Sequence, residues 1–325
     1  MFLLSAVSAP VPTVTLSNGV EMPMLTLGTG TSTWRNNTST AATVQMGLLA
    51  GFSGVDTANS YRNQEGVASG IAEARQAGVK GHVWITTKIE GCGSPESGVI
   101  DCFNDTLSKF HQNLELLGTQ QVDLTLLHAP PCIPNAPWTE GCGGPGGVYP
   151  DHTNCSAAEP CAMVQAQWRA LELMYHNNAS RAIGVSNYCG ACLRCIKQAA
   201  TVMPHVNQFK LHAAMGSADP AGLVSATMAL GSLVHAYQAL AHGDGSLLHN
   251  EEVAKVGAAH NKSAAQVALR WDLQQGHPIA VSVDKEEFAA EDLDVFDFAL
   301  TPAEMDLLSS LTSSPDSPVG NMCVL

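Results

Sequence analysis

Four residues whose side chains can move or stabilise a proton stand at or near the ends of short apolar runs. Asp56, Lys88 and His128 each end such a run, and Tyr61 follows Asp56 by five residues. A tyrosine beside a lysine can act as a general acid, because a nearby ammonium stabilises the phenolate and lowers the phenol's pKa from about 10. A carboxylate fixes the lysine, and an imidazole can hydrogen-bond a carbonyl oxygen. Together the four could protonate an oxygen that becomes negative as hydride reaches its carbon.

More polar residues end or follow the later apolar runs. Ser186 and Asn187 follow the fifth run, Gln208 ends the sixth and Tyr237 ends the seventh. In a barrel of parallel strands these ends open on one mouth, where the catalytic groups of barrel enzymes lie. Taken singly, each residue also has an ordinary structural role, such as a turn acid, an ion-pair partner, a core histidine or a helix cap. Six polar strand ends in succession favour a functional site.

The elements that must position these residues alternate in type along the chain. Strand-length apolar runs occur at 25–28, 54–56, 83–88, 122–128, 182–186, 206–209, 233–237 and 279–283, and helix-length periodic stretches between them include 40–50, 65–77, 102–117, 163–176, 189–200 and 251–273. Such alternation predicts a parallel sheet, and eight repeats predict an α/β protein of the (β/α)8 TIM-barrel type.

An N-terminal β-hairpin is expected to cap the base of this barrel. Val14 and Leu16 alternate with polar residues, a turn follows at 17–19, and the alternation resumes at Val20. An open doubly wound sheet is the alternative, but no third glycine follows Gly28 and Gly30 to complete a dinucleotide-binding fingerprint. We expect a tail or signal remnant at 1–12 and one barrel domain at 13–325, with a cysteine-rich loop insertion at about 130–161.

Eight motifs occur along the chain in the order found in one known family. They are Leu16-Ser-Asn-Gly19 with Met22-Pro23, Asp56-Thr-Ala-Asn-Ser-Tyr61-Arg-Asn63, Trp84-Ile-Thr-Thr-Lys88, Val122-Asp-Leu-Thr-Leu-Leu-His128, Arg181-Ala-Ile-Gly-Val-Ser-Asn187-Tyr188, Val206-Asn-Gln208, Ala268-Leu-Arg-Trp271 and Val295-Phe-Asp-Phe298. On these motifs, which span nearly the whole chain, the sequence resembles the aldo-keto reductase superfamily. Each motif alone is weak, and their joint order is highly specific.

The resemblance implies a role for each residue of the first group. Tyr61 would donate the proton in carbonyl reduction, and Lys88 would lower the pKa of Tyr61. Asp56 would pair with Lys88, and His128 would orient the carbonyl. The protein would then be an NAD(P)H-dependent carbonyl reductase or alcohol dehydrogenase that acts on a small-molecule carbonyl substrate without a metal.

The resemblance also implies NADP(H) as the hydride carrier. Ser186, Asn187 and Gln208 would hold the nicotinamide carboxamide, and Tyr237 would stack on the ring. The residues after Tyr237 depart from the family's usual Ser-Pro-Leu, because this chain has Gln238-Ala-Leu240 there. The protein's task would be to position the nicotinamide carbon against the carbonyl.

The eighth strand departs further from the family pattern. The family places a lysine, and later an arginine, against the 2′-phosphate of the nucleotide, whereas this chain has Ser282 and Phe288 near those positions. Asp284 and two glutamates add negative charge, and Lys285 is the nearby cation. Charge-assisted contacts to phosphate are among the stronger hydrogen bonds. We therefore expect Ser282 to replace the lysine in the cofactor site, a weak preference for NADPH, and NAD(H) as an alternative cofactor.

The substrate pocket is also expected to be unusual. Gly30, Glu90 and Ala129 stand at positions where family members often carry aromatic residues. We expect a wider and more polar mouth, which makes polar sugars or polyols a further candidate substrate class. The insertion at 130–161 follows the fourth strand, so it should lie over this mouth. The alternative is a surface loop without a role at the site.

Cysteines and glycosylation sequons indicate the compartment. Four of the ten cysteines fall within the insertion, where disulfides would hold a stretch without periodic apolar positions. N-x-[ST] sequons begin at Asn36, Asn37, Asn104, Asn154, Asn178 and Asn261. The first ten residues are similar to the end of a signal peptide but lack a basic start. We predict a disulfide-bonded glycoprotein of the secretory pathway or extracellular space, with the cytoplasm as the alternative.

The pattern Cys189-x-x-Cys192-x-x-Cys195 invites a metal-site interpretation. A fourth ligand at the spacing of a cluster motif is missing, and no matched Cys/His pair follows nearby. We therefore predict disulfides or buried thiols at these positions.

The charge balance restricts the partners. The 325 residues include 15 basic and 29 acidic residues, a net charge of −14, which argues against nucleic acid and against an anionic membrane surface. No apolar run approaches the roughly 18 residues that a membrane span needs. A monomer is expected from the resemblance. The alternative function is a non-catalytic nucleotide-binding or regulatory protein that kept the barrel.

Overall fold

Eight parallel strands close into a barrel in the computed structural model, which describes residues 10–30, 36–92, 101–131, 139–140, 152–243, 245–313 and 318. The strands are β3 (Leu25–Gly28), β4 (Gly54–Asp56), β5 (Trp84–Ile89), β6 (Val122–Leu127), β9 (Ser180–Ser186), β10 (Val206–Lys210), β11 (Leu233–Tyr237) and β12 (Ile279–Val281). They neighbour one another in chain order, and β12 pairs in parallel with β3 to close the ring. The predicted (β/α)8 barrel is confirmed, and the open-sheet alternative is wrong because neither β3 nor β12 is an edge strand.

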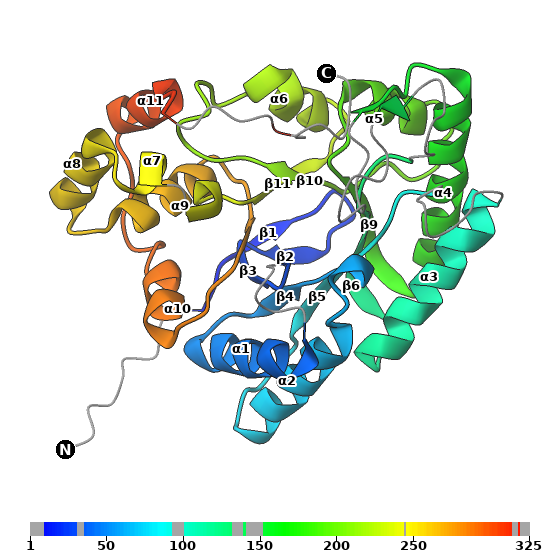
Figure 1. Ribbon diagram of the computed structural model, residues 1–325, viewed down its shortest axis with the longest axis horizontal. Helices are drawn as coiled ribbons and strands as arrows, with labels where there is room; N and C mark the ends of the chain where they lie inside the picture. Colours follow the sequence, from blue (N-terminus) through cyan, green and yellow to red (C-terminus); the bar gives the residue numbers. More distant parts are fainter. Residues whose placement is uncertain are drawn as a thin grey trace.

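The helices form the outer layer around these strands (Figure 1). They are α1 (Asn37–Ala50), α2 (Gln64–Gln76), α3 (Cys102–Leu117), α4 (Ala158–His176), α5 (Gly190–Lys197), α6 (Leu223–Met228), α7 (Gly245–Leu248), α8 (Glu251–His260), α9 (Ala264–Gln274), α10 (Glu286–Leu293) and α11 (Pro302–Ser310). In α2 the buried Val67, Ile71 and Ala74 recur with helical spacing, so one stripe faces the barrel.

One predicted helix is two helices. The periodic stretch 251–273 breaks between α8 and α9, where Asn261 adopts a left-handed φ of 55°. The Ser263 hydroxyl then starts α9 by accepting a hydrogen bond from the Gln266 backbone N–H, and the Ser263 backbone N–H donates to the side-chain oxygen of Gln266. This capping box is a strong helix start, and it interrupts a hydrophobic period that otherwise continues.

The hairpin of β1 (Thr13–Thr15) and β2 (Glu21–Pro23) closes the base of the barrel. In Figure 1 it lies across the centre of the ring. Leu16 and Met22 are buried and pack against inward-facing side chains of the strands, among them Trp84 and Leu124. The bottom of the barrel is therefore an apolar plug, and the polar strand ends are left to the opposite mouth.

Disulfides hold the loops and helices around the mouth. They join Cys92 to Cys102, Cys155 to Cys192 and Cys161 to Cys195, and Cys189 is disulfide-bonded as well. The prediction of disulfides for the C-x-x-C-x-x-C pattern is thus confirmed. Helix α4 begins at Ala158, so Cys161 lies in its first turns and not in the loop to which the sequence assigned it.

The described part of the insertion is short. Two-residue strands β7 (Thr139–Glu140) and β8 (His152–Thr153) pair antiparallel, and the Thr153 hydroxyl donates to the Pro131 carbonyl at 2.8 Å. Residues 132–138 and 141–151, including Trp138 and Tyr149, lie outside the described residues, as do residues 1–9 of the expected tail. The position of the insertion over the mouth and the domain limits at 1–12 and 13–325 therefore stay predictions. No helix in the described ranges is long and apolar enough to cross a membrane.

Candidate active site

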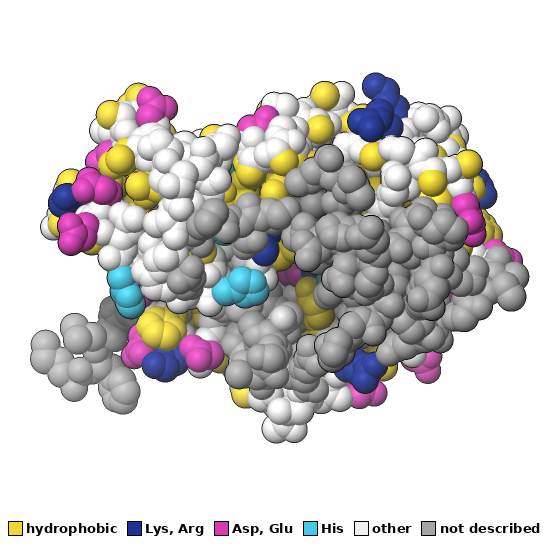
Figure 2. Space-filling model, turned by 45° about the horizontal axis from the view of Figure 1, so that its top comes forward, with side chains coloured by type: hydrophobic (Ala, Val, Ile, Leu, Met, Phe, Trp, Pro, Cys, Tyr) yellow, Lys and Arg dark blue, Asp and Glu magenta, His cyan; other side chains and the backbone are white. Residues whose placement is uncertain are grey.

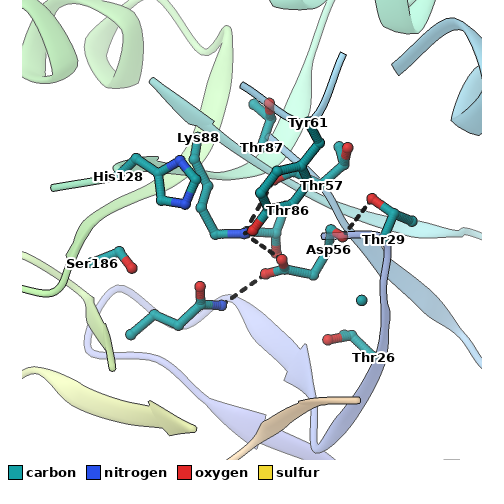
Figure 3. Close-up of polar contacts among 12 residues, drawn as sticks. Thr26, Thr29, Asp56, Thr57, Tyr61, Thr86, Thr87, Lys88, His128 and Ser186 are labelled. Carbon is teal, nitrogen blue, oxygen red and sulfur yellow. Dashed lines mark hydrogen bonds and ion pairs between the residues drawn. The ribbon is translucent and has the colours of Figure 1, made fainter. Parts of the chain in front are cut away.

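Asp56, Lys88 and Tyr61 meet at the mouth end of β4 and β5. The Lys88 ammonium forms an ion pair with an Asp56 carboxylate oxygen and donates to the Thr57 carbonyl at 3.2 Å. Its Nζ also lies 3.3 Å from the Tyr61 hydroxyl. Figure 3 shows the three groups pointing toward one another at the centre of the site. Asp56 and Lys88 are each less than 5% exposed, so this is a buried ion pair with a phenol in contact.

The backbone around Tyr61 fixes the phenol against the ion pair. Residues Asn59–Tyr61 form a short 3-10 turn, which Arg62 ends at a left-handed φ of 55°. Gly30 faces the phenol from β3's loop: a Cβ at this position would lie 2.6 Å from the Tyr61 ring carbon that carries the hydroxyl. Glycine at position 30 therefore lets the phenol take this position, and a side chain there would displace the ring.

The electrostatics of the site keep the phenol protonated. Burial, together with the negative charges of Asp56 and Glu90, raises the pKa of Tyr61 well above its usual value of about 10. The expectation that Lys88 lowers the pKa of Tyr61 stays a prediction, because the net rise comes from burial and from two carboxylates and does not isolate the contribution of Lys88. Burial lowers the pKa of Lys88, and Asp56 opposes that shift. A protonated phenol next to a charged pair is an acid that can donate one proton.

His128 completes the group from the end of β6. Its ring packs edge-on against Tyr61, with ring centroids 5.5 Å apart, and its Nδ1 lies 3.2 Å from the Ser60 hydroxyl. Burial, and secondarily the charge of Lys88, lowers the pKa of His128 well below 6.5. The ring is therefore neutral near pH 7. When Ser60 donates to Nδ1, the ring proton lies on Nε2, where it can be donated to an oxygen.

The residues expected to hold a nicotinamide form one hydrogen-bonded group. The Asn187 amide donates to the His128 carbonyl at 2.9 Å and to the Ser186 hydroxyl at 3.0 Å. The Tyr237 hydroxyl donates to the Asn187 amide oxygen at 2.8 Å. Asn187 adopts a left-handed φ of 60°, a conformation that asparagine tolerates well. This turn brings the ends of β9 and β11 to the same place as His128.

Gln208 links this group to the ion pair. Its amide donates to the second oxygen of Asp56 at 2.7 Å and to Nδ1 of His235 at 3.0 Å. Both amide hydrogens are thereby used, and the amide oxygen of Gln208 is directed elsewhere as an acceptor. Together with the Ser186 hydroxyl as a donor, it matches the C=O and NH2 groups of a carboxamide. The residues present therefore fit a nicotinamide.

His235 is a site residue that sequence reasoning missed. It lies on β11, two residues before Tyr237, and is fully buried. Burial lowers the pKa of His235 to about 4, so the ring accepts the Gln208 hydrogen as a neutral base. The alternation of side chains along a strand could have found it. Residues two apart on a strand point to the same side, so His235 faces the same side as Tyr237.

Ser282 lies apart from these groups, after β12. Its hydroxyl donates to the Gly28 carbonyl at 3.0 Å. Beyond it, the exposed Lys285 lies 3.7 Å from a Glu287 carboxylate and over the ring of Phe288. Within the described residues of this segment, the positive charge is thus already shared with an acid. The role of Ser282 in a cofactor site stays a prediction.

Comparison with known proteins identifies the family. The sequence profile of the aldo/keto reductase family matches residues 24–313. The chain belongs to the aldo/keto reductase family. A glyoxal reductase from Bacillus subtilis is 33% identical over 309 residues, 95% of each chain. A morphine 6-dehydrogenase from Pseudomonas putida is 32% identical, covering 92% of this chain and 91% of its own. The crystal structure of an aldo/keto reductase from Brucella melitensis matches with a TM-score of 0.72 and 27% identity, over 92% of this chain and 98% of that one.

Family membership fixes the general chemistry of this aldo/keto reductase. It is a nicotinamide-dependent oxidoreductase that acts on carbonyl groups. Among the described residues, no group of three or more His, Cys, Asp or Glu side chains is placed to hold a metal ion. The groups gathered at the mouth are a proton donor, an ion pair, a neutral imidazole and amide hydrogen-bonding groups.

Proposed function

We propose that the protein reduces an aldehyde or ketone, with Tyr61 as proton donor and Asp56, Lys88 and His128 as its partners. The observation that carries the proposal is the contact of the Tyr61 hydroxyl with the Lys88–Asp56 ion pair, with His128 edge-on to the phenol. Ser186, Asn187, Gln208 and Tyr237 would hold the nicotinamide that supplies the hydride.

The proton follows a short path in this proposal. His128 donates a hydrogen bond through Nε2 to the carbonyl oxygen and holds it near the Tyr61 hydroxyl. As the carbonyl carbon gains hydride, its oxygen becomes basic and takes the phenolic proton. The adjacent Lys88 ammonium stabilises the phenolate that remains, and Asp56 holds Lys88 in place. Each contact acts on charge that develops during the reaction, which is where an enzyme gains rate.

Substitution of the phenol tests this function. Tyr61→Phe removes the proton and keeps the ring, so turnover of aldehydes should fall by about 10²–10⁴-fold while nucleotide binding persists. Tyr175→Phe is the matched control, because Tyr175 lies on α4 away from the mouth. Equal loss in both variants would contradict the role of Tyr61. Nucleotide binding without turnover in the natural protein would favour the alternative of a non-catalytic nucleotide-binding protein.

We also propose that NAD(H) serves about as well as NADP(H). The support is the acidic segment after β12, in which Lys285 lies against Glu287 and no arginine stands at Phe288. Titration with NADPH and NADH should give comparable dissociation constants, and Phe288→Arg should strengthen NADPH binding because it adds a guanidinium that suits phosphate. A preference for NADPH of several hundred-fold in the natural protein would contradict this proposal.

We propose further that the protein is a monomeric glycoprotein of the secretory pathway. The disulfides around the mouth support an oxidising compartment, and the asparagines of all six sequons are exposed. Protein secreted from eukaryotic cells should lose mass on treatment with a peptide N-glycosidase and should sediment as a monomer. An unchanged mass would leave the glycosylation proposal without support, and a larger sedimenting species would overturn the monomer.

A further inference from the structure

Glu90 is an acid in the substrate region that the proposed reaction does not use. It follows β5 by one residue and stands two residues after Lys88, so its side chain leaves the strand on the side of the mouth. It is close enough to Tyr61 that its charge raises the pKa of the phenol. The backbone N–H of Ser60, whose hydroxyl lies 3.2 Å from Nδ1 of His128, hydrogen-bonds with the Glu90 carboxylate. Glu90 therefore borders the place where the carbonyl must lie.

Within the part of the chain that the structure describes, one oxygen of the Glu90 carboxylate has no hydrogen-bond partner. The Oε1 atom is buried and accepts no hydrogen bond from the described residues. Buried polar groups in native proteins are nearly always paired, and a buried charge without a partner is costly. A group that persists in this state beside a reaction site is best explained by a ligand that completes it.

The surrounding charges leave Glu90 unmatched. Lys88 is engaged by Asp56, and His128 is neutral. Lys109 acts on Glu90 only through its field, because its ammonium is bound to Asp105 at 2.9 Å. Burial raises the pKa of Glu90, and hydrogen bonds and the field of Lys109 oppose that shift. Because Asp56 and Lys88 cancel, an ionised Glu90 gives the pocket one net negative charge. A positive charge on the substrate would balance it.

We propose that Glu90 is a specificity-determining residue that selects cationic carbonyl compounds, those that carry an ammonium group next to the carbonyl. The ammonium would donate to Oε1 of Glu90 while the carbonyl oxygen lies against Tyr61 and His128. A neutral donor such as a hydroxyl group can hydrogen-bond to this oxygen but does not balance the negative charge of Glu90. A carboxylate on the substrate is repelled by that charge. This inference rests on the proposed carbonyl reduction at the same site.

Four ketones of nearly equal size test it. Aminoacetone, hydroxyacetone and butanone differ only in the group on the carbon next to the carbonyl, which is ammonium, hydroxyl or methyl; pyruvate carries a carboxylate directly on the carbonyl carbon. The natural protein should prefer them in that order by kcat/KM, with aminoacetone at least about tenfold ahead of butanone. Glu90→Gln should collapse the ratio of aminoacetone to butanone, and Glu90→Asp, which keeps the charge, should restore part of it. The exposed Glu73→Gln on α2 removes the same charge elsewhere and should leave the ratio unchanged.

A binding measurement separates this inference from the proposed reaction. By calorimetry, 1-amino-2-propanol should bind the nucleotide complex at least about tenfold more tightly than 2-butanol, and Glu90→Gln should erase the difference. Equal binding of the two alcohols, or equal ratios in Glu90→Gln and the natural protein, would overturn the role of Glu90. Absence of turnover for all four ketones and for the aldehydes used with Tyr61→Phe would overturn the proposed reaction instead, and the binding result would still decide the role of Glu90.

Discussion

At the scale of single residues, hydrogen bonds between the polar side chains of the site fix the orientation of each one. Asp56 uses one carboxylate oxygen for Lys88 and the other for Gln208. Gln208 donates its second amide hydrogen to His235, and this bond orients the amide oxygen of Gln208 as an acceptor. The proposed proton donor and the proposed nicotinamide contacts are therefore positioned by one connected chain of bonds, and a change at His235 should alter binding of the cofactor.

Replacement of His235 tests this connection. In His235→Phe the Gln208 hydrogen loses its acceptor in a buried place, so the amide is free to turn and nicotinamide binding should weaken about tenfold. His235→Asn offers an acceptor again and should recover part of the affinity. Titration with nucleotide, with thermal unfolding as a check on the fold, measures both. Unchanged affinity in a folded His235→Phe protein would show that His235 does not position Gln208.

At the scale of elements, the strand ends place the site and the disulfides secure one side of it. Helix α5 begins three residues after Asn187, and the bonds from Cys155 to Cys192 and from Cys161 to Cys195 tie this helix to the start of α4. The turn that carries Asn187 is thus anchored by helix packing and by covalent bonds. These cysteines are not among the family motifs, and we infer that they help to hold the side of the mouth where the nucleotide is proposed to bind.

Removal of one of these bonds tests that contribution. The double variant Cys161→Ser, Cys195→Ser opens a loop of 34 residues and should lower the free energy of unfolding by ~2–4 kcal/mol. It should also weaken nucleotide binding, because the turn before α5 is less restrained. The double variant at Cys92 and Cys102 removes a bond on the other side of the mouth and should affect nucleotide binding less. Equal nucleotide affinity in all three proteins would contradict an anchoring role.

The strands and the main site residues could be predicted from the sequence because their signals are local. Apolar runs ending in Asp56, Lys88 and His128 need no tertiary information, and the strand limits shift by only a few residues. The break at Asn261 and the role of His235 depend on capping geometry and on a partner from another strand. The direction of the pKa shift of Tyr61 depends on burial and on the approach of the Asp56 and Glu90 carboxylates, and this environment exists only in the folded chain.

At the scale of the whole molecule, acidity is present at the surface and in the interior. The chain carries a net charge of −14, and on the face in Figure 2 acidic and basic side chains lie scattered among uncharged surface. A field of this sign attracts cations, which agrees with the cationic substrate proposed above. Inside, Asp292 on α10 is 4% exposed, and burial together with Glu291 raises the pKa of Asp292 to about 8.

The pH dependence of stability tests this buried acid. Between pH ~4 and ~8 the folded chain keeps the Asp292 proton that the unfolded chain loses, so its contribution to stability falls as pH rises. Asp292→Asn cannot titrate and should be more stable than the natural protein by ~2–4 kcal/mol at pH 7, with a gap that shrinks toward pH 4. Denaturant unfolding across this range measures the gap, with the exposed Asp306→Asn as control. A gap independent of pH would show that Asp292 does not titrate as proposed.

The most direct test of the central claim is the transfer of a labelled hydride. The natural protein is mixed with an aldehyde and a reduced nicotinamide nucleotide deuterated on the transferring face of the ring, and the alcohol product is analysed by mass spectrometry. We predict one deuterium on the carbinol carbon, and we predict that Tyr61→Phe binds the same nucleotide but forms almost no labelled alcohol. Alcohol without deuterium, or equal labelling by both proteins, would contradict hydride transfer assisted by proton donation from Tyr61.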